Sequence, residues 1–512
     1  MSDEVELKLA LRSKDLRRLR ALSWVRAAAK RFAIRETLVS VYYDTKRFAL
    51  RDNGVSLRVR RTGRKRFQTI KATGSGAPFA RKEWEVEISG DEPDFTCMRD
   101  TALEPLLTKA LRHGLKPVFE TRVRRTALLI QTGGSKVELA MDQGVIMCGG
   151  QSRRISEVEL ELKAGNPAAL CKIAARLSRS VPVRYGTKTK PERGYALLEG
   201  RYDKPAWSEA IALKKDANTA AAFQAIGLSC LRHLASNEDA IRKRDGEGIH
   251  QMRVGLRRLR AAISIFKDIL QDRQSEHLKV ELRWLTEQLA PARDYDVFLE
   301  DSVQPMQESQ PQRRELATLH AALLKERATG FAKARDAVAS ERYRRLVLRA
   351  ALWLANGNWC ANPDGSQRGH RAQPIRVFAR EILTRLTSKI VKKIEKLEKL
   401  DARHRHKLRI AVKKLRYATE FFDSLFAHTK KERKALIKVL EKLQTAMGKL
   451  NDIRVQEGLA DKIVQRRNIQ KGREMSLAVG LVQGQEQRNI KQLLETAAKA
   501  GAHLPKLKPF WK

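Results

Sequence analysis

The sequence is poor in cysteine and aromatic residues and has no long hydrophobic run. Its 512 residues include five cysteines, an odd number without the spacing of a metal site, so we expect reduced thiols rather than a disulfide framework. No apolar segment reaches the roughly 18 residues that a membrane helix needs. The first residues are acidic and lack the basic-then-apolar order of a signal peptide. These absences predict a cytoplasmic protein that does not insert into a membrane.

Acidic residues are far fewer than basic ones. The chain has 103 lysines and arginines against 59 aspartates and glutamates, which gives a net charge of +44, and both halves are basic. A polyanionic partner is therefore the first hypothesis, and nucleic acid, an anionic membrane face and inorganic polyphosphate all meet that description. Aromatic residues make up only 6% of the chain, and no zinc or recognition-helix signature is present, so we expect no specific nucleic-acid binding.

The first part of the chain alternates short strands with turns, whereas the remainder is helical. We predict helices over 13–33, 100–113 and 166–180, and strands over 4–9, 38–44, 55–61, 66–72, 83–89, 118–130, 136–142 and 155–163. Eight strands at this spacing predict an antiparallel barrel or tunnel with flanking helices. From about residue 216 apolar residues recur at helical spacing. We therefore expect an α+β domain over 1–202, a linker over 203–215 and an all-α domain over 216–505.

Most predicted strands carry apolar residues on one face and charges of mainly one sign on the other. The acidic faces hold Glu4 and Glu6, then Glu83, Glu85 and Glu87, then Glu157, Glu159 and Glu161, with Glu138 and Asp142; the basic faces hold Arg58, Arg60, Lys71, Arg122 and Arg124. An ordinary half-buried sheet with its charges in water is one explanation. We favour the other, in which the apolar faces pack outward under helices and the charged faces converge inside the barrel. There the arginines and lysines would hold phosphate oxygens, and the carboxylates would hold Mg²⁺ or Mn²⁺.

Several of these motifs occur together in one known family. Glu4-x-Glu6-x-Lys8, the Arg58-x-Arg60 strand, the Glu157-to-Glu161 strand and Lys190-x-x-Arg193-Gly194-Tyr195 resemble the CYTH superfamily, the triphosphate tunnel metalloenzymes. The resemblance implies a tunnel that cleaves a triphosphate with a divalent metal. It implies catalytic roles for Glu4, Glu6, Lys8 and Lys71. As metal ligands we take Glu4, Glu6, Glu85, Asp142, Glu157, Glu159 and Glu161, and which members of each acidic run bind the ion stays open. As triphosphate-binding residues we take Lys8, Arg58, Arg60, Lys71, Arg122, Arg124, Lys188 and Lys190.

The helical half contains an internal repeat. The segment from His250 to Arg260 matches the segment from His406 to Arg416, and Arg293-Asp294 matches Asn451-Asp452 at nearly the same spacing. These matches predict two duplicated helical bundles related by a pseudo-twofold axis. Each copy presents a basic stripe at helical spacing, formed by His250, Arg253, Arg257 and Arg260 and by His406, Arg409, Lys413 and Arg416. A solvated helix face is the plain alternative, but such faces usually intersperse acids for i,i+4 pairs, and these do not.

The duplicated His-x-x-Arg signature resembles the CHAD domain, a helical module commonly found behind CYTH domains. This resemblance implies that the two basic stripes bind long-chain inorganic polyphosphate in a central groove. Lys413 and Lys414 replace the Arg257 and Arg258 of the first copy, which exchanges bidentate forks for point charges. We expect Arg293-Asp294 and Asn451-Asp452 to support the bundle rather than to contact ligand.

The sequence as a whole predicts a metal-dependent triphosphatase that hydrolyses inorganic triphosphate to diphosphate and phosphate. Hydrolysis of a nucleoside or thiamine triphosphate, a class IV-type adenylate cyclase and a non-catalytic polyphosphate-binding scaffold are the alternatives. The preferred substrate, the metal, the oligomeric state and any regulation of the tunnel by the helical domain stay open at this point.

Overall fold

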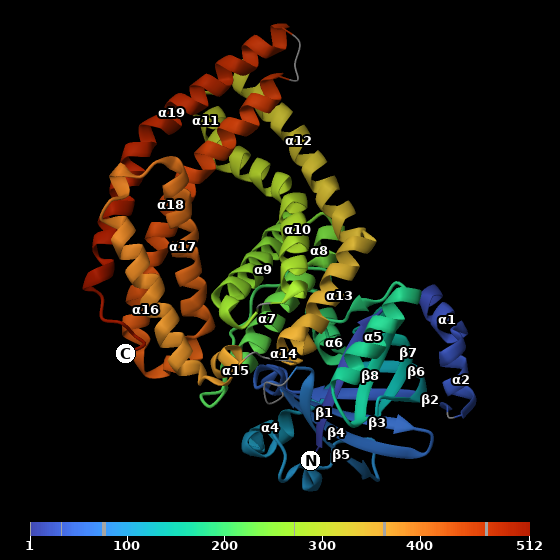
Figure 1. Cartoon of the computed structure of the whole chain (residues 1–512). Helices are drawn as coiled ribbons and strands as arrows, with labels where there is room; N and C mark the ends of the chain where they lie inside the picture. Colours follow the sequence, from blue (N-terminus) through green and yellow to red (C-terminus); the bar gives the residue numbers. More distant parts are fainter. Residues whose placement is uncertain (1, 32, 74–77, 271, 362–364, 466–468) are drawn as a thin grey trace. The chain divides into compact units, whose positions relative to one another are not determined.

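The computed structural model describes residues 2–31, 33–73, 78–270, 272–361, 365–465 and 469–512. The chain forms two compact units (Figure 1). Unit 1 comprises Met1–Pro205 together with Ser340–Ala361, and unit 2 comprises Ala206–Ala339 together with Asn362–Lys512. The sequence analysis placed 340–361 inside the helical domain, so the membership of this segment differs from that prediction.

Unit 1 is built on a closed antiparallel barrel. Its strands are β1 (Ser2–Ala10), β2 (Ala33–Asp44), β3 (Val55–Thr62), β4 (Lys65–Thr73), β5 (Ala80–Ile88), β6 (Lys116–Thr132), β7 (Ser135–Cys148) and β8 (Gln151–Ala164). They follow the order β5-β4-β3-β2-β6-β7-β8-β1, and β5 pairs with β1 to close the circle. A two-residue strand, β9 (Arg184–Tyr185), also pairs with β1. The predicted eight-stranded tunnel with flanking helices is confirmed.

The apolar side of the strands faces outward, where helices cover part of the barrel. Leu7 and Leu9 of β1 and Leu160 of β8 are fully buried and belong to a core with α1 (Ser13–Ala21) and α5 (Ala168–Ser180). Because side chains alternate along a strand, this packing turns Glu6, Lys8 and the glutamates of β8 to the inside. The remaining elements here are α2 (Ser23–Arg31), α3 (Ala49–Asp52) and α4 (Lys109–Gly114). The helix expected over 13–33 is thus two short helices, and only the end of the one expected over 100–113 is α-helical.

One helix, α6 (Lys190–Leu198), fixes the position of Lys190. Thr189 and Glu192 form a capping box at its start, so the first residue of the helix, Lys190, has a defined direction. Gly194 lets the helix approach the barrel closely, because a Cβ there would lie 2.3 Å from the ring of Phe119 on β6. The side chain of Lys190 is consequently buried among the strands.

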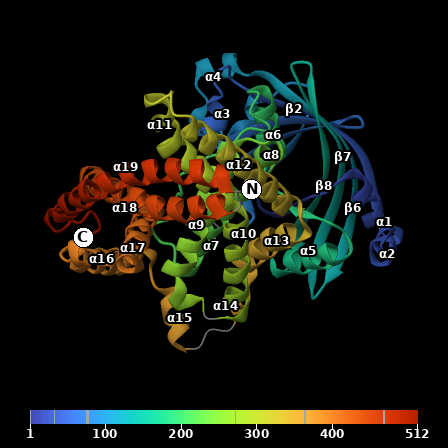
Figure 2. The ribbon, with the colours of Figure 1, turned by 90° about the horizontal axis from the view of Figure 1, so that it is seen from above.

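A segment from the middle of the helical half completes unit 1. Helix α13 (Glu341–Asn356) packs against α5 and β9, and it is followed by α14 (Asn358–Ala361). Leu348 of α13 is only 2% exposed and belongs to the same hydrophobic core as Leu7 and Leu9. Figure 2 shows α13 beside α5. The strand that carries Glu4, Glu6 and Lys8 is therefore supported by residues that are distant in sequence.

Unit 2 consists of helices, as predicted. They are α7 (Thr219–Ala235), α8 (Glu238–Arg242), α9 (Gly246–Ile265), α10 (Arg273–Phe298), α11 (Gln304–Ser309), α12 (Arg314–Ala339), α15 (Gly365–Ala372), α16 (Ile375–Ile394), α17 (Ala402–Phe421), α18 (Lys430–Gln465) and α19 (Ile469–Ala502). Contacts run α7–α9–α10–α12 in the first half and α16–α17–α18–α19 in the second. The same succession of neighbours in both halves agrees with the internal repeat. Within the described residues, every helix is too short or too polar to cross a bilayer.

The role of α13 leads to a stability prediction. Leu348→Ala removes a buried side chain from the barrel's core, so we expect unit 1 to lose about 2–4 kcal/mol of unfolding free energy. Arg345→Ala is the matched control, because Arg345 is exposed on the same helix and pairs only with Glu341. Chemical denaturation followed by tryptophan fluorescence measures both. Equal stability of the two variants would contradict the assignment of α13 to unit 1.

Candidate functional site

The barrel encloses a charged cavity of about 270 Å³. Among the described residues, nine carboxylates and eight cations line this cavity. The carboxylates are those of Glu4, Glu6, Glu36, Glu83, Glu85, Glu138, Asp142, Glu159 and Glu161. The cations are those of Lys8, Arg58, Arg60, Lys71, Arg81, Arg125, Lys163 and Lys190. The two signs are partly segregated. Carboxylates gather on β1, β7 and β8, whereas the arginine pair lies on β3. Charged groups that share a closed space must be paired or must bind ions.

The acidic side of the cavity is a row across three strands. Glu6 of β1 lies opposite Glu161 of β8, and Glu161 lies opposite Glu138 of β7. Like charges in directly opposed positions repel each other. Burial, followed by the neighbouring Glu159, raises the pKa of Glu6 to about 7. Burial also raises the pKa of Glu161. Lys163 pairs with Glu161 at 2.6 Å and with Glu138 at 3.8 Å, yet the pKa of Glu161 stays raised because the group is buried.

Two lysines reach into this acidic side. The Nζ atom of Lys8 lies 2.5 Å from Oε2 of Glu6 and 2.6 Å from Oε1 of Glu159. The Nζ atom of Lys71 lies 2.5 Å from Oε2 of Glu4. Burial alone would raise the pKa of Glu4, but the charge and hydrogen bond of Lys71, together with the charge of Lys8, outweigh it and the pKa is lowered. All four residues that were expected to be catalytic line this cavity. Lys8 pairs with Glu6, and Lys71 pairs with Glu4.

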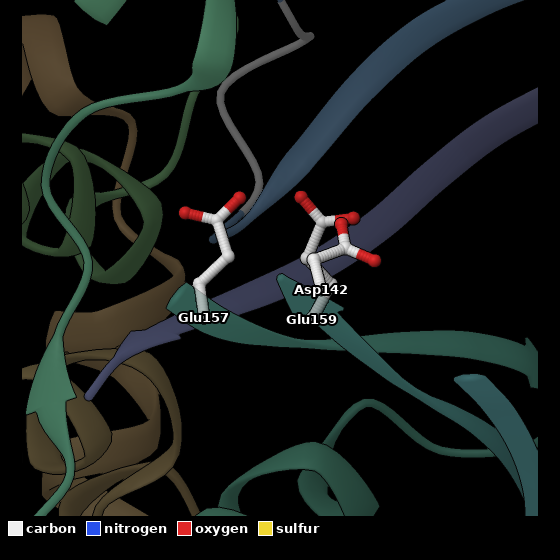
Figure 3. Close-up of side chains that lie close together, drawn as sticks. All are labelled: Asp142, Glu157 and Glu159. Carbon is white, nitrogen blue, oxygen red and sulfur yellow. The ribbon is translucent and has the colours of Figure 1, made fainter. Parts of the chain in front are cut away.

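A second carboxylate group lies beneath the end of α6. One oxygen each of Asp142, Glu157 and Glu159 lies within 4.8 Å of the others, and Figure 3 shows the three side chains close together. The Nζ atom of Lys190 is 2.7 Å from Asp142, 2.6 Å from Glu157 and 2.8 Å from Glu159. The ammonium group thus sits where a cation bound by this triad would sit. Lys190 was expected to hold phosphate, and its contacts here are to carboxylates.

The basic side presents buried guanidinium groups with unused donors. The Nε atoms of both Arg58 and Arg60 are buried and make no hydrogen bond within the described part of the chain. Burial, followed by the charges of Arg58 and Arg125, lowers the pKa of Arg60 to about 10. The nearest carboxylate of Arg60 is that of Glu85, at 4.0 Å. Buried, unsatisfied guanidinium groups of this kind fit an anion with several oxygen acceptors.

The position of two predicted arginines is corrected by the structure. Arg122 and Arg124 are exposed on the outside of β6, and Arg125 lines the cavity in their place. Nε and Nη2 of Arg125 contact Asp142 at 2.8 and 2.7 Å, and Nη2 also contacts Glu159. The spacing of Arg122 and Arg124 resembled a charged inner face, but the alternation of β6 places both on its exposed side. The inward positions of β6 hold Thr121, Val123 and Ala127 besides Arg125.

The other predicted residues are distributed as follows. Glu4, Glu6, Lys8, Arg58, Arg60, Lys71, Glu85, Asp142, Glu159, Glu161 and Lys190 line the cavity, whereas Glu157 and Lys188 do not. Glu85 lies on the basic side, where Thr69 donates a hydrogen bond of 2.8 Å to it. Tyr42, Ser40 and Thr121 are cavity residues that the sequence analysis missed. Their inward positions follow from the alternation of β2 and β6, but their neutral side chains gave no charge pattern.

The acidic row supplies the kind of ligand that a divalent cation takes. Glu4, Glu6, Glu138 and Glu161 offer carboxylate oxygens, which Mg²⁺ and Mn²⁺ prefer. Among the described residues, however, only Asp142, Glu157 and Glu159 have oxygens within 4.8 Å of one another, so the row would have to draw together around an ion. Burial and neighbouring carboxylates raise the pKa values of Glu6 and Glu161, and a bound cation would favour their ionised forms. The triad of Asp142, Glu157 and Glu159 fits a metal less well, because Lys190 already neutralises it.

In unit 2 the predicted stripes lie on α9 and α17, which contact each other. Burial, followed by Arg409 and Arg257, lowers the pKa of Lys413 to about 7. Arg257 comes from the first repeat and Lys413 from the second, so the two basic stripes are close enough to repel each other. The buried Nε atoms of Arg257 and Arg409 make no hydrogen bond within the described residues. Uncompensated positive charge is thus concentrated between the repeats.

The flanking members of the stripes are held by polar neighbours. Nη1 of Arg253 donates to the backbone oxygen of Leu289 at 2.9 Å, and Nη2 lies 3.3 Å from Asp294. Nδ1 of His406 is 2.9 Å from Oδ1 of Asn451. His250 and Arg260 lie on the same face of α9, and Nη1 of Arg260 donates to Thr286. Arg416 pairs with Glu420 on its own helix.

Comparisons with known proteins agree with the division of the chain. The CYTH domain model matches residues 2–195, and the CHAD domain model matches residues 225–461. An inorganic triphosphatase of Haemophilus influenzae is 30% identical over 205 residues, which are 38% of this chain and 55% of that protein. The match thus spans about half the length of this curated relative. The crystal structure of the CHAD domain from the plant Ricinus communis is 29% identical, covers 59% of this chain and 97% of that one, and gives a TM-score of 0.50.

The CYTH match covers the barrel with its charged cavity, and the CHAD match covers most of the duplicated helical unit. The chain therefore belongs to the proteins in which a CYTH domain is followed by a CHAD domain.

Proposed function

We propose that the barrel hydrolyses inorganic triphosphate with the help of a divalent metal ion, releasing diphosphate and phosphate. The observation that carries this proposal is the pair of buried guanidinium groups, Arg58 and Arg60, whose Nε donors are unused in a cavity that is also lined by nine carboxylates. One side is suited to phosphate oxygens and the other to cations. The named activity of the Haemophilus relative supports the same reading.

The charge balance of the cavity supports a metal requirement. Nine carboxylates and eight cations line it, so the cavity is nearly neutral without substrate. A triphosphate brings several negative charges into this confined space, and Lys8, Lys71, Arg125 and Lys190 are already engaged with carboxylates. Divalent ions that enter with the substrate would restore the balance.

The shape and lining favour an inorganic substrate over a nucleotide. Tyr42 is the one aromatic side chain among the described residues that line the cavity, and its ring is stacked on Phe119 at 4.6 Å. That face is therefore not free to stack on a nucleobase. The rest of the lining is mostly charged, with a few aliphatic side chains such as Ile34 and Leu38, which suits a chain of phosphates. A nucleoside or thiamine triphosphate is consequently the second choice, and an adenylate cyclase is disfavoured.

The residues divide the work according to their charge. Arg58 and Arg60 bind and orient the phosphate chain, while Lys8 holds Glu6 in place and Lys71 holds Glu4 in place and favours its ionised form. Glu4, Glu6 and Glu161, with Glu138, would hold the metal. When bound, the ion would neutralise charge on the transferring group and acidify a water molecule for in-line attack. Arg125 and Lys190 position Asp142 and Glu159 beside the row.

The acidic row gives the main test of the enzyme. We expect Glu4→Gln with Glu6→Gln to reduce phosphate release from tripolyphosphate by about 100-fold at saturating Mg²⁺, because the amides lose the charge that binds a cation. Glu87→Gln is the control, since Glu87 is exposed on β5 and pairs with Lys65 outside the cavity. Unchanged activity of the double variant would refute the catalytic proposal. ATP and thiamine triphosphate in parallel assays rank the substrates.

The corrected arginine gives a second test. Arg125→Lys keeps the charge but loses the fork that holds Asp142, so we expect kcat/KM for tripolyphosphate to fall by about tenfold. Arg124→Lys makes the same change on the outer face and should leave kcat/KM unaltered. Melting temperatures of both variants separate this effect from a loss of stability. A larger effect at Arg124 than at Arg125 would contradict the placement of β6.

We propose further that unit 2 binds longer polyphosphate with the stripes on α9 and α17. The support is the repulsion between Arg257, Arg409 and Lys413, which a polyanion would relieve. A polyanionic ligand would also explain why both copies of the stripe are basic although their charges repel each other. The fold of the Ricinus communis CHAD structure agrees with the arrangement of the helices.

The lowered pKa of Lys413 makes this binding dependent on pH. In the free protein Lys413 is half protonated near pH 7, and a bound polyanion favours its charged form and raises its pKa. Binding then takes up a proton, so affinity should fall by up to about tenfold per pH unit above pH 7. Lys413→Arg stays charged and should flatten this dependence, whereas Lys407→Arg, at an exposed site of α17, should not. Titration calorimetry with long-chain polyphosphate at pH 6.5, 7.5 and 8.5 measures it. The same slope in all three proteins would refute the role of Lys413.

A further inference from the structure

Unit 2 contains a second cavity, of about 380 Å³, away from the basic stripes. It lies between α12 and the junction of α8 and α9. Leu324 and Phe331 of α12 supply apolar surface, and three arginines complete the lining, namely Arg244, Arg327 and Arg335. None of the described residues that line it is acidic. A hollow of this size with an apolar body and a few charged groups is typical of a small-molecule site.

The three arginines are not equivalent. Arg327 contacts the buried carboxylate of Asp296, and its guanidinium lies over the ring of Phe331, 5.0 Å from the centroid. It is therefore neutralised and holds the aromatic ring in place. Among the described residues, Arg335 pairs with its exposed neighbour Asp336, at 3.6 Å, and such surface pairs contribute little. Arg244 and Arg335 thus bring unbalanced positive charge to the rim of the cavity.

The backbone at Arg244 indicates that this side chain has a specific purpose. Its φ is +63°, in the left-handed region where glycine is usual at the end of a helix. Its N–H bonds to the oxygen of Ile241, and the next N–H bonds to the oxygen of Ala240, both at 3.0 Å. This backbone conformation favours glycine, but the residue present is an arginine, and it lines the cavity.

The second repeat provides an internal comparison. Asp245 and Asp401 both cap the helix that carries a basic stripe, and they occupy matching positions. The residue before Asp401 is Leu400, which is extended, with φ −77° and ψ 132°. An arginine in the left-handed conformation is consequently not needed to start such a helix. It is a feature of the first repeat alone, where the cavity lies.

We propose that this cavity binds a small anion with a flat aromatic body, of the nucleoside phosphate class. Arg244 and Arg335 would take the phosphate oxygens, and the base would lie against the apolar surface of Leu324 and Phe331, outside the ring face that Arg327 covers. Charge complementarity excludes cationic ligands, and the apolar surface distinguishes the site from the stripes on α9 and α17. The proposal does not depend on the activity of the barrel.

Titration calorimetry of the full chain with ADP in the presence of EDTA tests this site. Arg244→Gly removes the guanidinium but suits the backbone, so the fold is retained, and we expect ADP to bind about tenfold more weakly. Phe331→Leu should weaken ADP binding to a similar degree. Lys243→Ala removes the adjacent charge, which does not line the cavity, and should bind ADP as the unaltered protein does.

Three results would overturn the proposal. The first is an absence of ADP binding at millimolar concentration. The second is binding that Arg244→Gly and Phe331→Leu leave unchanged, which would place the nucleotide elsewhere. The third is inorganic diphosphate binding as tightly as ADP, which would remove the role of the aromatic ring.

Discussion

The barrel depends on how buried charge is balanced inside it. Carboxylates on β1, β7 and β8 share a closed space, and Lys8, Lys71, Arg125 and Lys190 neutralise most of them. Without these cations the carboxylates could not stay ionised away from water. The balance is incomplete at Glu6 and Glu161 on one side and at Arg58 and Arg60 on the other. Those two places are where the cavity is suited to accept charge from outside.

In the helical unit the charges that lack partners are all positive. Arg257, Arg409 and Lys413 lie close together without enough carboxylates to neutralise them. Such an arrangement costs stability in the free protein, and a bound polyanion would recover that cost. Both units thus hold unmatched charges in fixed positions.

Much of this could be predicted from the sequence, because alternation along strands is a strong signal. The inward side of β1, β3 and β8 followed from Glu4-x-Glu6-x-Lys8, Arg58-x-Arg60 and the glutamates of β8. The run Arg122-Val-Arg-Arg misled, since three arginines in four residues fit either face, and the bare outer surface was not visible in the pattern. The placement of α13 in unit 1 could not be predicted either. Its composition is that of any bundle helix, and only the packing of Leu348 shows which core it joins. The contact of Lys190 with three carboxylates likewise depends on how α6 approaches the barrel.

The central claim is that metal and triphosphate meet inside the barrel on opposite sides of one cavity. Crystals of the protein grown with Mn²⁺ and tripolyphosphate, measured at the manganese absorption edge, test it directly. The account predicts an anomalous peak beside Glu6 and Glu161, with phosphate density reaching Arg58 and Arg60. Manganese bound only at the outer surface, or phosphate density confined to the helical unit, would contradict it.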